Sequence, residues 1–379
     1  MKYYIIAGEP SGDLHGANLM KGLKNVDPEA EFRFWGGDKM AEIGGRENLV
    51  RHYRESSFFG FVQVLCNLSK IFRQLSDCKR DIEEWQPDVV VLVDYPGFNL
   101  KIAKFAHERG VKVFYYIAPK VWAWKERRVK QLRKYVDRLF IIFPFEREYF
   151  RSKGIEAVFC GNPLTDAIAQ RQASLPSAED FRRANSLDNR PIVALLAGSR
   201  RAEIDDNLPN MVALSRRFPT HRFVVAGVSW LERSLYDLHL AGSDVAYVCD
   251  RTYELLNVAE AAVVTSGTAT LETALLNVPE MVVFKVPWLY EKLKPYLLKI
   301  PFVSLVNINL GRESVREMVT CRFDMAEAER ELASILVGGA KREKMLADFA
   351  ELRTIIGSDG VAERFAARMV AELKNEPEQ

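Results

Sequence analysis

Two short turns in the second half of the chain carry residue types that suit a phosphate group. Gly198-Ser199-Arg200 and Ser266-Gly267-Thr268 each follow an apolar run and precede a helical pattern. A helix start presents free backbone N–H groups and the positive end of the helix dipole, which favour an anion. The guanidinium of Arg200 can bind two phosphate oxygens. With Glu203 and Glu272 nearby, the turns predict a nucleotide site; the alternative is two ordinary N-capped helix starts.

A carboxylate stands where the most apolar run of the first half ends. Asp94 follows residues 88–93 and precedes Tyr95-Pro96-Gly97. In a doubly wound domain this position faces the ligand, so Asp94 is a candidate general base that could accept a proton from an attacking hydroxyl. The alternative is a turn or N-cap carboxylate, because Pro96 and Gly97 favour a turn.

The first loop of the chain, Gly8-Glu9-Pro10-Ser11-Gly12-Asp13, is glycine-rich but matches neither a dinucleotide fingerprint nor a P-loop. Glu9 would repel a phosphate placed over it. A sugar hydroxyl is a better partner for Glu9 and Ser11, because a carboxylate accepts hydrogen bonds from hydroxyl groups. The alternative is a capped turn with Ser11 or Asp13 as the N-cap.

Residues 119–135 form a basic segment with two tryptophans, including Trp122, Trp124, Arg127 and Arg128. Nucleic acid, anionic lipid and a phosphorylated substrate are the candidate partners. The formal net charge of only +2 argues against nucleic acid. Tryptophan beside arginine is common at membrane interfaces. The alternative is a solvated helix face whose tryptophans pack into the domain.

Residues 58–75 have an apolar stripe at helical spacing that is broader than one core face needs. Phe58, Phe59 and Phe61 widen it. A core helix and an exposed patch for lipid are both open at this point. Residues 287–299 have a similar basic and aromatic mixture, for which a surface helix is the preferred interpretation.

Short apolar runs alternate with amphipathic stretches along the chain, which predicts an α/β fold with a doubly wound sheet in each half. The polar region 162–190 separates the halves, so we expect two domains with a cleft between them. The predicted strands are Tyr3–Ala7, Glu31–Trp35, Asp88–Val93, Val111–Ile117, Arg138–Ile142, Ala157–Cys160, Ile192–Leu196, Arg222–Ala226, Val245–Val248, Ala261–Thr265 and Met281–Phe284.

Composition sets broad limits on the class of protein. The chain has 379 residues, which is enough for two domains. Its content of 48% hydrophobic and 27% charged residues is typical of a globular protein. Its five cysteines include no C-x-x-C pair, so we expect neither a metal site nor a disulfide framework. A reducing cytoplasm is the simplest setting, since no signal-peptide core and no run of about 20 apolar residues is found.

Taken together, these motifs resemble those of the lipid-A-disaccharide synthase family of bacterial glycosyltransferases. The resemblance runs nearly the whole length of the chain, and its most specific elements are the Val-Trp-Ala-Trp and Phe-Pro-Phe-Glu segments. The matching segments are Gly8–Asp13 with Gly16-Ala17, Val121-Trp122-Ala123-Trp124, Phe143-Pro144-Phe145-Glu146, Asp94–Asn99, Gly198-Ser199-Arg200 with Glu203, Ser266–Ala269 with Leu271-Glu272, and Ser304–Asn307 with Gly311–Glu313.

The resemblance implies a GT-B fold, in which two Rossmann-like domains face each other across a cleft. Residues 1–165 would form the acceptor and membrane-facing domain, and 190–350 the UDP-sugar domain. Residues 351–379 would form a C-terminal helix that packs back on the N-terminal domain or on a partner. Dimers formed by exchanging this segment are known in the family, so a homodimer is compatible with the sequence without following from it.

The resemblance also implies a reaction: transfer of 2,3-diacylglucosamine from UDP to 2,3-diacylglucosamine 1-phosphate, with formation of a β-1,6 disaccharide. Asp94 would be the base, Arg200 would bind the diphosphate and Asn307 would lie in the active cleft. No metal or other cofactor is expected. The protein would be peripheral on the cytoplasmic face of the inner membrane.

The chain departs from the family pattern at two positions. Ala197 stands where proline is common before Gly-Ser-Arg, and Asn162 stands where histidine is common before proline. Two other functions remain open from the sequence: another GT-B transferase or epimerase with a soluble UDP-sugar substrate, and a non-catalytic nucleotide or lipid carrier. A soluble acceptor would need no lipid-facing surface, and a carrier would need no base.

Overall fold

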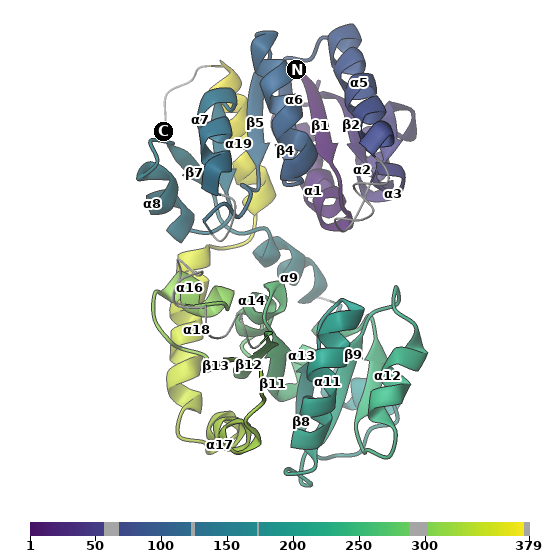
Figure 1. Ribbon diagram of the computed structural model, residues 1–379, viewed down its shortest axis with the longest axis vertical. Helices are drawn as coiled ribbons and strands as arrows, with labels where there is room; N and C mark the ends of the chain where they lie inside the picture. Colours follow the sequence, from purple (N-terminus) through teal and green to yellow (C-terminus); the bar gives the residue numbers. More distant parts are fainter. Residues whose placement is uncertain (57–67, 123–125, 173, 288–301, 375–379) are drawn as a thin grey trace. The chain divides into compact units, whose positions relative to one another are not determined.

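The computed structural model describes the chain except for residues 57–67, 123–125, 173, 288–301 and 375–379. It divides into two compact units (Figure 1), one formed by Met1–Asp166 with Gly357–Gln379 and the other by Ala167–Ile356. Among the described residues, no helix combines the length and apolar composition that a bilayer-spanning segment requires.

The first unit contains a parallel sheet with the strand order β3-β2-β1-β4-β5-β6-β7. Chain order reverses between β1 and β4, as in a Rossmann fold. The side chains of β1 alternate between two buried clusters: Tyr3 lies in one, and Tyr4 in the other. The strands are β1 (Lys2–Ala7), β2 (Glu31–Gly36), β3 (Leu49–His52), β4 (Val89–Val93), β5 (Lys112–Tyr116), β6 (Arg138–Ile141) and β7 (Ala157–Phe159).

Helices cover both faces of this sheet, which explains why its central strands are continuously apolar. The helices are α1 (Pro10–Val26), α2 (Asp38–Gly44), η1 (Arg46–Asn48), α3 (Tyr53–Ser56), α5 (Leu68–Trp85), α6 (Pro96–Glu108), η2 (Glu126–Arg128), α7 (Val129–Tyr135), α8 (Phe145–Arg151) and α19 (Val361–Lys374).

The C-terminal helix α19 packs on the first unit, beside α1. The Asp166 carboxylate accepts the N–H groups of Val361 and Ala362 at 3.0 and 2.9 Å and so caps the helix start. Phe365 lies edge-on to Tyr116, with ring centroids 5.0 Å apart. At Gly22 an added Cβ would lie 2.8 Å from the Ala362 carbonyl oxygen, so a glycine is needed for this close helix contact.

The second unit repeats the design with the strand order β10-β9-β8-β11-β12-β13, again parallel. Here chain order reverses between β8 and β11. Its strands are β8 (Ile192–Leu196), β9 (Arg222–Gly227), β10 (Ala246–Cys249), β11 (Ala259–Thr265), β12 (Glu280–Lys285) and β13 (Glu317–Thr320). Its helices are α10 (Ala178–Ala184), α11 (Arg201–Ser215), α12 (Arg233–Leu240), α13 (Thr252–Val258), α14 (Thr268–Leu275), α16 (Leu305–Leu310), α17 (Met325–Ile335) and α18 (Arg342–Ile356), while α9 (Leu164–Gln172) spans the division.

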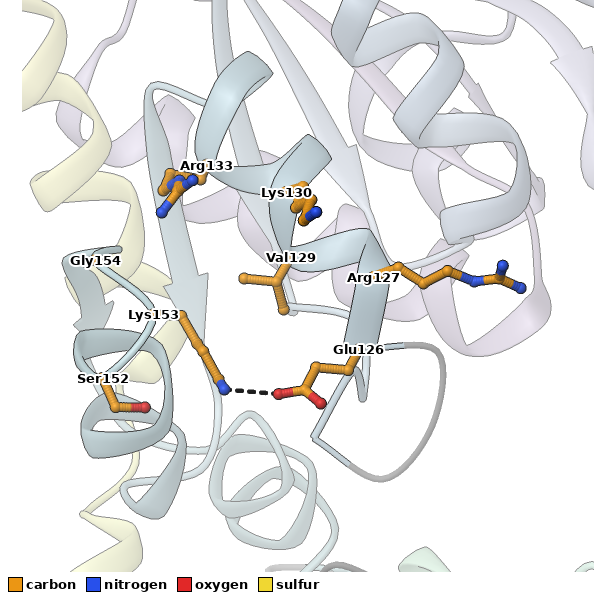
Figure 2. Close-up of a pocket in the computed structure, with 8 residues that line it drawn as sticks. All are labelled: Glu126, Arg127, Val129, Lys130, Arg133, Ser152, Lys153 and Gly154. Atoms are coloured by element: carbon orange, nitrogen blue, oxygen red, sulfur yellow. Dashed lines mark ion pairs between the residues drawn. The ribbon is translucent and has the colours of Figure 1, made fainter.

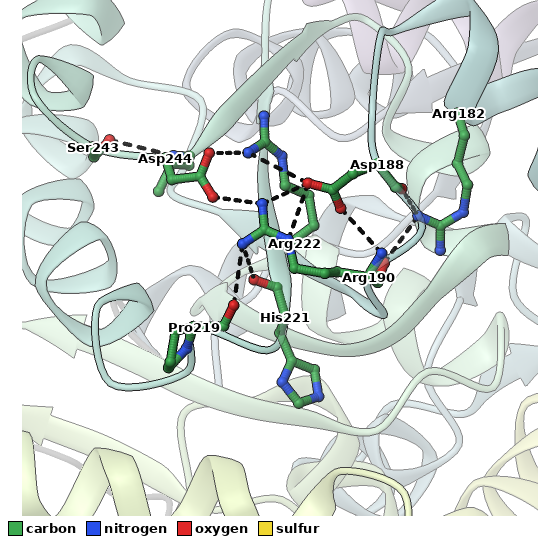
Figure 3. A network of polar contacts seen from close by, with 9 residues as sticks. Arg182, Asp188, Arg190, Pro219, His221, Arg222, Ser243 and Asp244 are labelled. Atoms are coloured by element: carbon green, nitrogen blue, oxygen red, sulfur yellow. Dashed lines mark hydrogen bonds and ion pairs between the residues drawn. The ribbon is translucent and has the colours of Figure 1, made fainter.

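A network of arginines and aspartates ties the amino ends of β8 and β9 to the segment before β10 (Figure 3). Arg190 donates to Asp188 at 2.6 Å and to Asp244 at 2.5 Å, and Arg222 also pairs with Asp244. These groups lie at the amino ends of the strands, whereas the candidate residues follow the carboxyl ends. We therefore infer that the network stabilises the fold and takes no part in the site.

The eleven predicted strands are present, with ends shifted by up to two residues. The edge strands β3 and β13 were not predicted, because both are short and only partly buried. The polar region 162–190, in which the sequence placed the domain boundary, contains α9 and α10 and no strand among its described residues. The first part of the expected apolar stripe, residues 58–67 with Phe58, Phe59 and Phe61, lies outside the described residues. The remainder, residues 68–75, lies in α5.

Candidate active site

In the first unit, the loops after β1 and β4 meet where the strand order reverses. These strands are neighbours, so their carboxyl ends lie at one edge of the sheet. A Cβ at Gly8 would lie 2.4 Å from the Tyr95 ring, so the two loops are in direct contact and only glycine permits it. The structure therefore brings the loop of Glu9 and Ser11 beside Asp94.

The backbone at Asp94 is held in an unusual conformation. Asp94 and Tyr95 have φ angles of 42° and 46°, in the left-handed region that residues with a Cβ rarely adopt. The Asp94 carbonyl oxygen accepts the Asn99 side-chain amide at 2.7 Å and the Tyr115 hydroxyl at 2.6 Å. These two buried donors fix the turn that aims the carboxylate.

The Asp94 carboxylate has the properties of a base. Its side chain retains access to solvent, yet crowding by surrounding protein atoms raises its pKa to about 6. This value is the net result of several effects: the Glu9 charge also raises the pKa, whereas Lys120, the Tyr95 N–H and Arg128 lower it. A pKa near neutrality balances the fraction of ionised base against its strength.

The remaining polar residues of the first loop divide between the surface and the fold. Ser11 is exposed in the first turn of α1, and Glu9 occupies the N-cap without a side-chain capping bond. The alternative interpretation, in which Ser11 or Asp13 caps this helix, was wrong. Asp13 is buried and instead caps α2, because its carboxylate accepts the N–H groups of Gly37, Lys39 and Met40 at 2.7, 3.2 and 3.1 Å.

Trp122 packs inside the domain rather than projecting from it. It is 7% exposed, and its indole N–H donates to Glu146 at 2.9 Å. Burial raises the pKa of Glu146 to about 7, although the Trp122 hydrogen bond lowers it. The Phe143–Glu146 segment thus holds the loop after β5. Arg127 is exposed and Arg128 half-buried, while Trp124 lies outside the described residues.

In the second unit, the two predicted phosphate turns follow the neighbouring strands β8 and β11 and so lie at one edge of the sheet. One feature differs from the expectation of free amides: the Glu203 carboxylate accepts the N–H groups of Ser199 and Arg200 at 2.9 and 3.2 Å. Glu203 also pairs with the Arg200 guanidinium at 3.0 Å. Gly198 has a φ of 118°, and a Cβ there would meet Glu203 at 2.5 Å.

The second turn is more open at the start of α14. Gly267 and Thr268 are exposed, whereas the Ser266 hydroxyl donates to the Val303 carbonyl at 3.1 Å. One turn further along the helix, Glu272 is half-buried and accepts the Tyr253 hydroxyl at 2.8 Å. Burial raises the pKa of Glu272, while the Tyr253 hydrogen bond and the Arg171 charge lower it. The Arg171 guanidinium stacks on the Tyr253 ring at 4.4 Å.

Asn307 is fully buried, and its side chain is committed to the fold. Its amide donates to the Val315 carbonyl at 2.8 Å and to Glu317 at 2.9 Å, and its oxygen accepts the N–H groups of Ser314 and Val315 at 2.8 and 3.0 Å. Glu317 in turn accepts the Ser304 N–H at 2.9 Å. This arrangement orders residues 303–304, next to Ser266, and uses both polar atoms of the Asn307 side chain.

Sequence reasoning missed several residues that organise the site. No role was predicted for Tyr115, Asn99, Glu146, Tyr253 and Glu317, because each belongs to a type common in cores and on surfaces and contacts a residue ten or more positions away. Two of them had a sequence signal: Glu146 is the last residue of the Phe-Pro-Phe-Glu segment, and Asn99 is the last residue of the Asp94–Asn99 segment.

Two Rossmann-like α/β domains with candidate residues at both strand-order reversals place the chain in the GT-B fold class. The solved structure of a putative UDP-N-acetylglucosamine 2-epimerase from Listeria monocytogenes is similar, with a TM-score of 0.69 over 99% of this chain and 97% of that one. At 13% identity, this likeness shows the fold alone.

The chain belongs to the lipid-A-disaccharide synthase family. Residues 3–362 match the family model described as lipid-A-disaccharide synthetase. The chain is 36% identical to the synthases of Geobacter metallireducens and Myxococcus xanthus, in each case over 97% of this chain and 96% of the relative. It is therefore a glycosyltransferase of lipid A biosynthesis that uses a UDP-sugar and a lipid-linked sugar, and the alternative with a soluble substrate is not favoured.

Proposed function

We propose that the donor is UDP-2,3-diacylglucosamine and the acceptor 2,3-diacylglucosamine 1-phosphate, and that the product is the β-1,6-linked disaccharide 1-phosphate. The acceptor 6-hydroxyl oxygen forms a bond to the anomeric carbon of the donor. The bond from that carbon to the UDP oxygen breaks, and UDP leaves with the electron pair. A single displacement inverts the anomeric centre and requires one base.

Asp94 is the base that takes the proton of the acceptor hydroxyl. The observation that carries this assignment is the solvent-accessible carboxylate with a pKa of about 6, on a backbone turn fixed by Asn99 and Tyr115. Glu9 and Ser11, in the adjacent loop, bind sugar hydroxyl groups. The side chain of Glu9 also keeps the pKa of Asp94 high through its charge.

The second domain binds the UDP portion of the donor. Arg200, 81% exposed at its side chain, pairs with the diphosphate, and the starts of α11 and α14 add backbone amides at Ser199 and Thr268. These groups stabilise the charge that UDP gains as the bond breaks, without a divalent ion. Glu272 accepts hydrogen bonds from donor hydroxyl groups through the oxygen that Tyr253 leaves free.

The protein works as a peripheral protein on the cytoplasmic face of the inner membrane, against an anionic lipid surface. The acyl chains of both substrates support this location, because they keep donor and acceptor in a bilayer. Arg127 and Arg128, which follow the loop after β5, lie on the acceptor-binding domain. Recovery of the protein in the soluble fraction after gentle lysis at low ionic strength would argue against this location.

The central experiment measures both products of the purified protein in detergent micelles. We expect UDP and the acylated disaccharide to form in equal amounts, with the new linkage in the β configuration by NMR. Release of UDP without disaccharide would indicate hydrolysis, and a change of sugar configuration without transfer would indicate an epimerase. Either outcome would overturn the proposed reaction.

A further inference from the structure

A basic pocket lies in the first unit, between the η2–α7 segment and the turn after α8 (Figure 2). Its volume is about 590 Å³. Four cationic side chains line it together with one carboxylate, that of Glu126. The cations are Arg127, Lys130, Arg133 and Lys153.

The single carboxylate is already neutralised, so the pocket has an excess of positive charge. Glu126 pairs with Lys153 at 2.7 Å, which Figure 2 shows as a dashed line. Within the described part of the chain, Arg127, Lys130 and Arg133 have no carboxylate within salt-bridge distance. A site with this charge favours an anion with several oxygens, such as a phosphate ester.

Three of the cations follow one another as a row along the η2–α7 segment. Arg127, Lys130 and Arg133 are three residues apart and exposed, whereas Val129, which also lines the pocket, is buried. Figure 2 shows the Arg127 side chain directed away from Lys130 and Arg133. Arg133 extends to the turn after α8, since a Cβ at Gly154 would lie 3.9 Å from its guanidinium. Because these cations are exposed along a segment, they can contact phosphate groups at a lipid surface more readily than they can enclose a single anion.

We propose that this pocket binds the phosphate of a phospholipid headgroup, an inference that rests on the proposed membrane location. The charge of the neighbouring residue Arg128 lowers the pKa of Asp94, so this end of the row lies near the proposed acceptor site. Headgroup binding here would place the acceptor site next to the lipid surface from which the acceptor comes. None of Lys130, Arg133 and Lys153 has a role in the proposed reaction.

The test is flotation of the full-length protein with phosphatidylcholine vesicles, with and without phosphatidylglycerol. The variant Lys130→Ala/Arg133→Ala should lose about tenfold to thirtyfold in partition onto the anionic vesicles, because each cation near such a surface contributes about 1 kcal/mol. The control Arg216→Ala/Arg330→Ala removes two exposed charges from the second unit and should bind as the wild type does. An equal loss in both variants, or none in the pocket variant, would overturn the proposal.

A substitution that should strengthen vesicle binding is a control for misfolding, because a misfolded variant would not gain affinity. Glu126→Gln releases Lys153 and should strengthen binding to anionic vesicles about fivefold; unchanged or weaker binding would count against the pocket. Calorimetry with inorganic phosphate separates the two sources of phosphate. If inorganic phosphate saturates the wild type and not the pocket variant while their vesicle binding is equal, the ligand is a soluble phosphate and the lipid assignment is wrong. Vesicle binding needs no turnover, so its failure is distinct from failure of the proposed reaction.

Discussion

The Glu203 carboxylate accepts the backbone N–H of Ser199 at 2.9 Å, in the turn proposed to bind the donor diphosphate. The same oxygen accepts the Arg200 N–H, so an internal anion occupies two of the amides that a phosphate would use. The diphosphate must therefore displace Glu203 or bind beside it. The turn is held in shape by a group that also competes with its ligand.

This competition predicts that Glu203→Gln strengthens UDP binding. The amide side chain can still accept the turn hydrogen bonds, but it no longer offsets the Arg200 charge. Removing about 1 kcal/mol of opposing interaction corresponds to about fivefold tighter binding in titration calorimetry. Asp205→Asn, which removes an exposed charge from the same helix, is the matched control and should change little. Weaker binding by Glu203→Gln would mean that the carboxylate itself contacts the donor.

Asp94→Asn should reduce turnover by at least about a hundredfold, the lower end of what a general base contributes, with UDP affinity nearly unchanged. Single-turnover rates near those of the wild type would place the base elsewhere. In the wild type, activity should rise with pH through about 6 and then level off, because only the ionised carboxylate accepts a proton.

The raised pKa of Asp94 also has a consequence for stability. The folded protein holds this proton up to about pH 6, above the usual aspartate range, so its contribution to stability falls as pH rises from about 4 through 6. Asp94→Asn should therefore raise the melting temperature at pH 7 and not at pH 4. An equal or opposite change at both values would contradict the burial argument.

Tyr115→Phe tests whether the backbone turn positions the base. It removes the hydroxyl that donates to the Asp94 carbonyl at 2.6 Å, so we expect kcat to fall roughly tenfold while KM stays constant. Tyr116→Phe is the matched control: within the described residues, its buried hydroxyl has no hydrogen-bond partner. Equal effects of the two substitutions on kcat would indicate a general packing effect.

Arg200→Ala should weaken both UDP binding and turnover. Loss of a charge-assisted hydrogen bond of about 1.5–3 kcal/mol corresponds to a fall in affinity of roughly tenfold to a hundredfold. The adjacent exposed Arg201 provides a control, because Arg201→Ala removes the same charge from the next position. Unchanged UDP titration by Arg200→Ala would remove this residue from the site.

Chelation tests the proposal that protein groups alone balance the charge of the leaving UDP. We expect turnover in excess EDTA to equal turnover without it, because Arg200 and the two helix starts supply the positive charge. Activity that disappears in EDTA and returns with Mg²⁺ would show that a divalent ion takes part.

The sequence by itself determined the central strands and the loops that follow them. A strand buried on both faces must be apolar at nearly every position, so runs such as 89–93 are recognisable without a partner. Polar and glycine residues directly after such runs must lie at the carboxyl edge of the sheet, which located Asp94 and Arg200. The strands β3 and β13 carry no such signal, because both are short and only partly buried.

Only the tertiary structure decided which groups these residues contact. Trp122 is buried because Glu146, 24 positions later, accepts its indole N–H. Asp13 accepts the N–H of Gly37, 24 positions later, and so caps α2, and the pKa of Asp94 depends on Glu9 from another loop. Periodicity reports which face of an element is buried, but a hydrogen bond or charge interaction depends on distances between segments that only packing brings together.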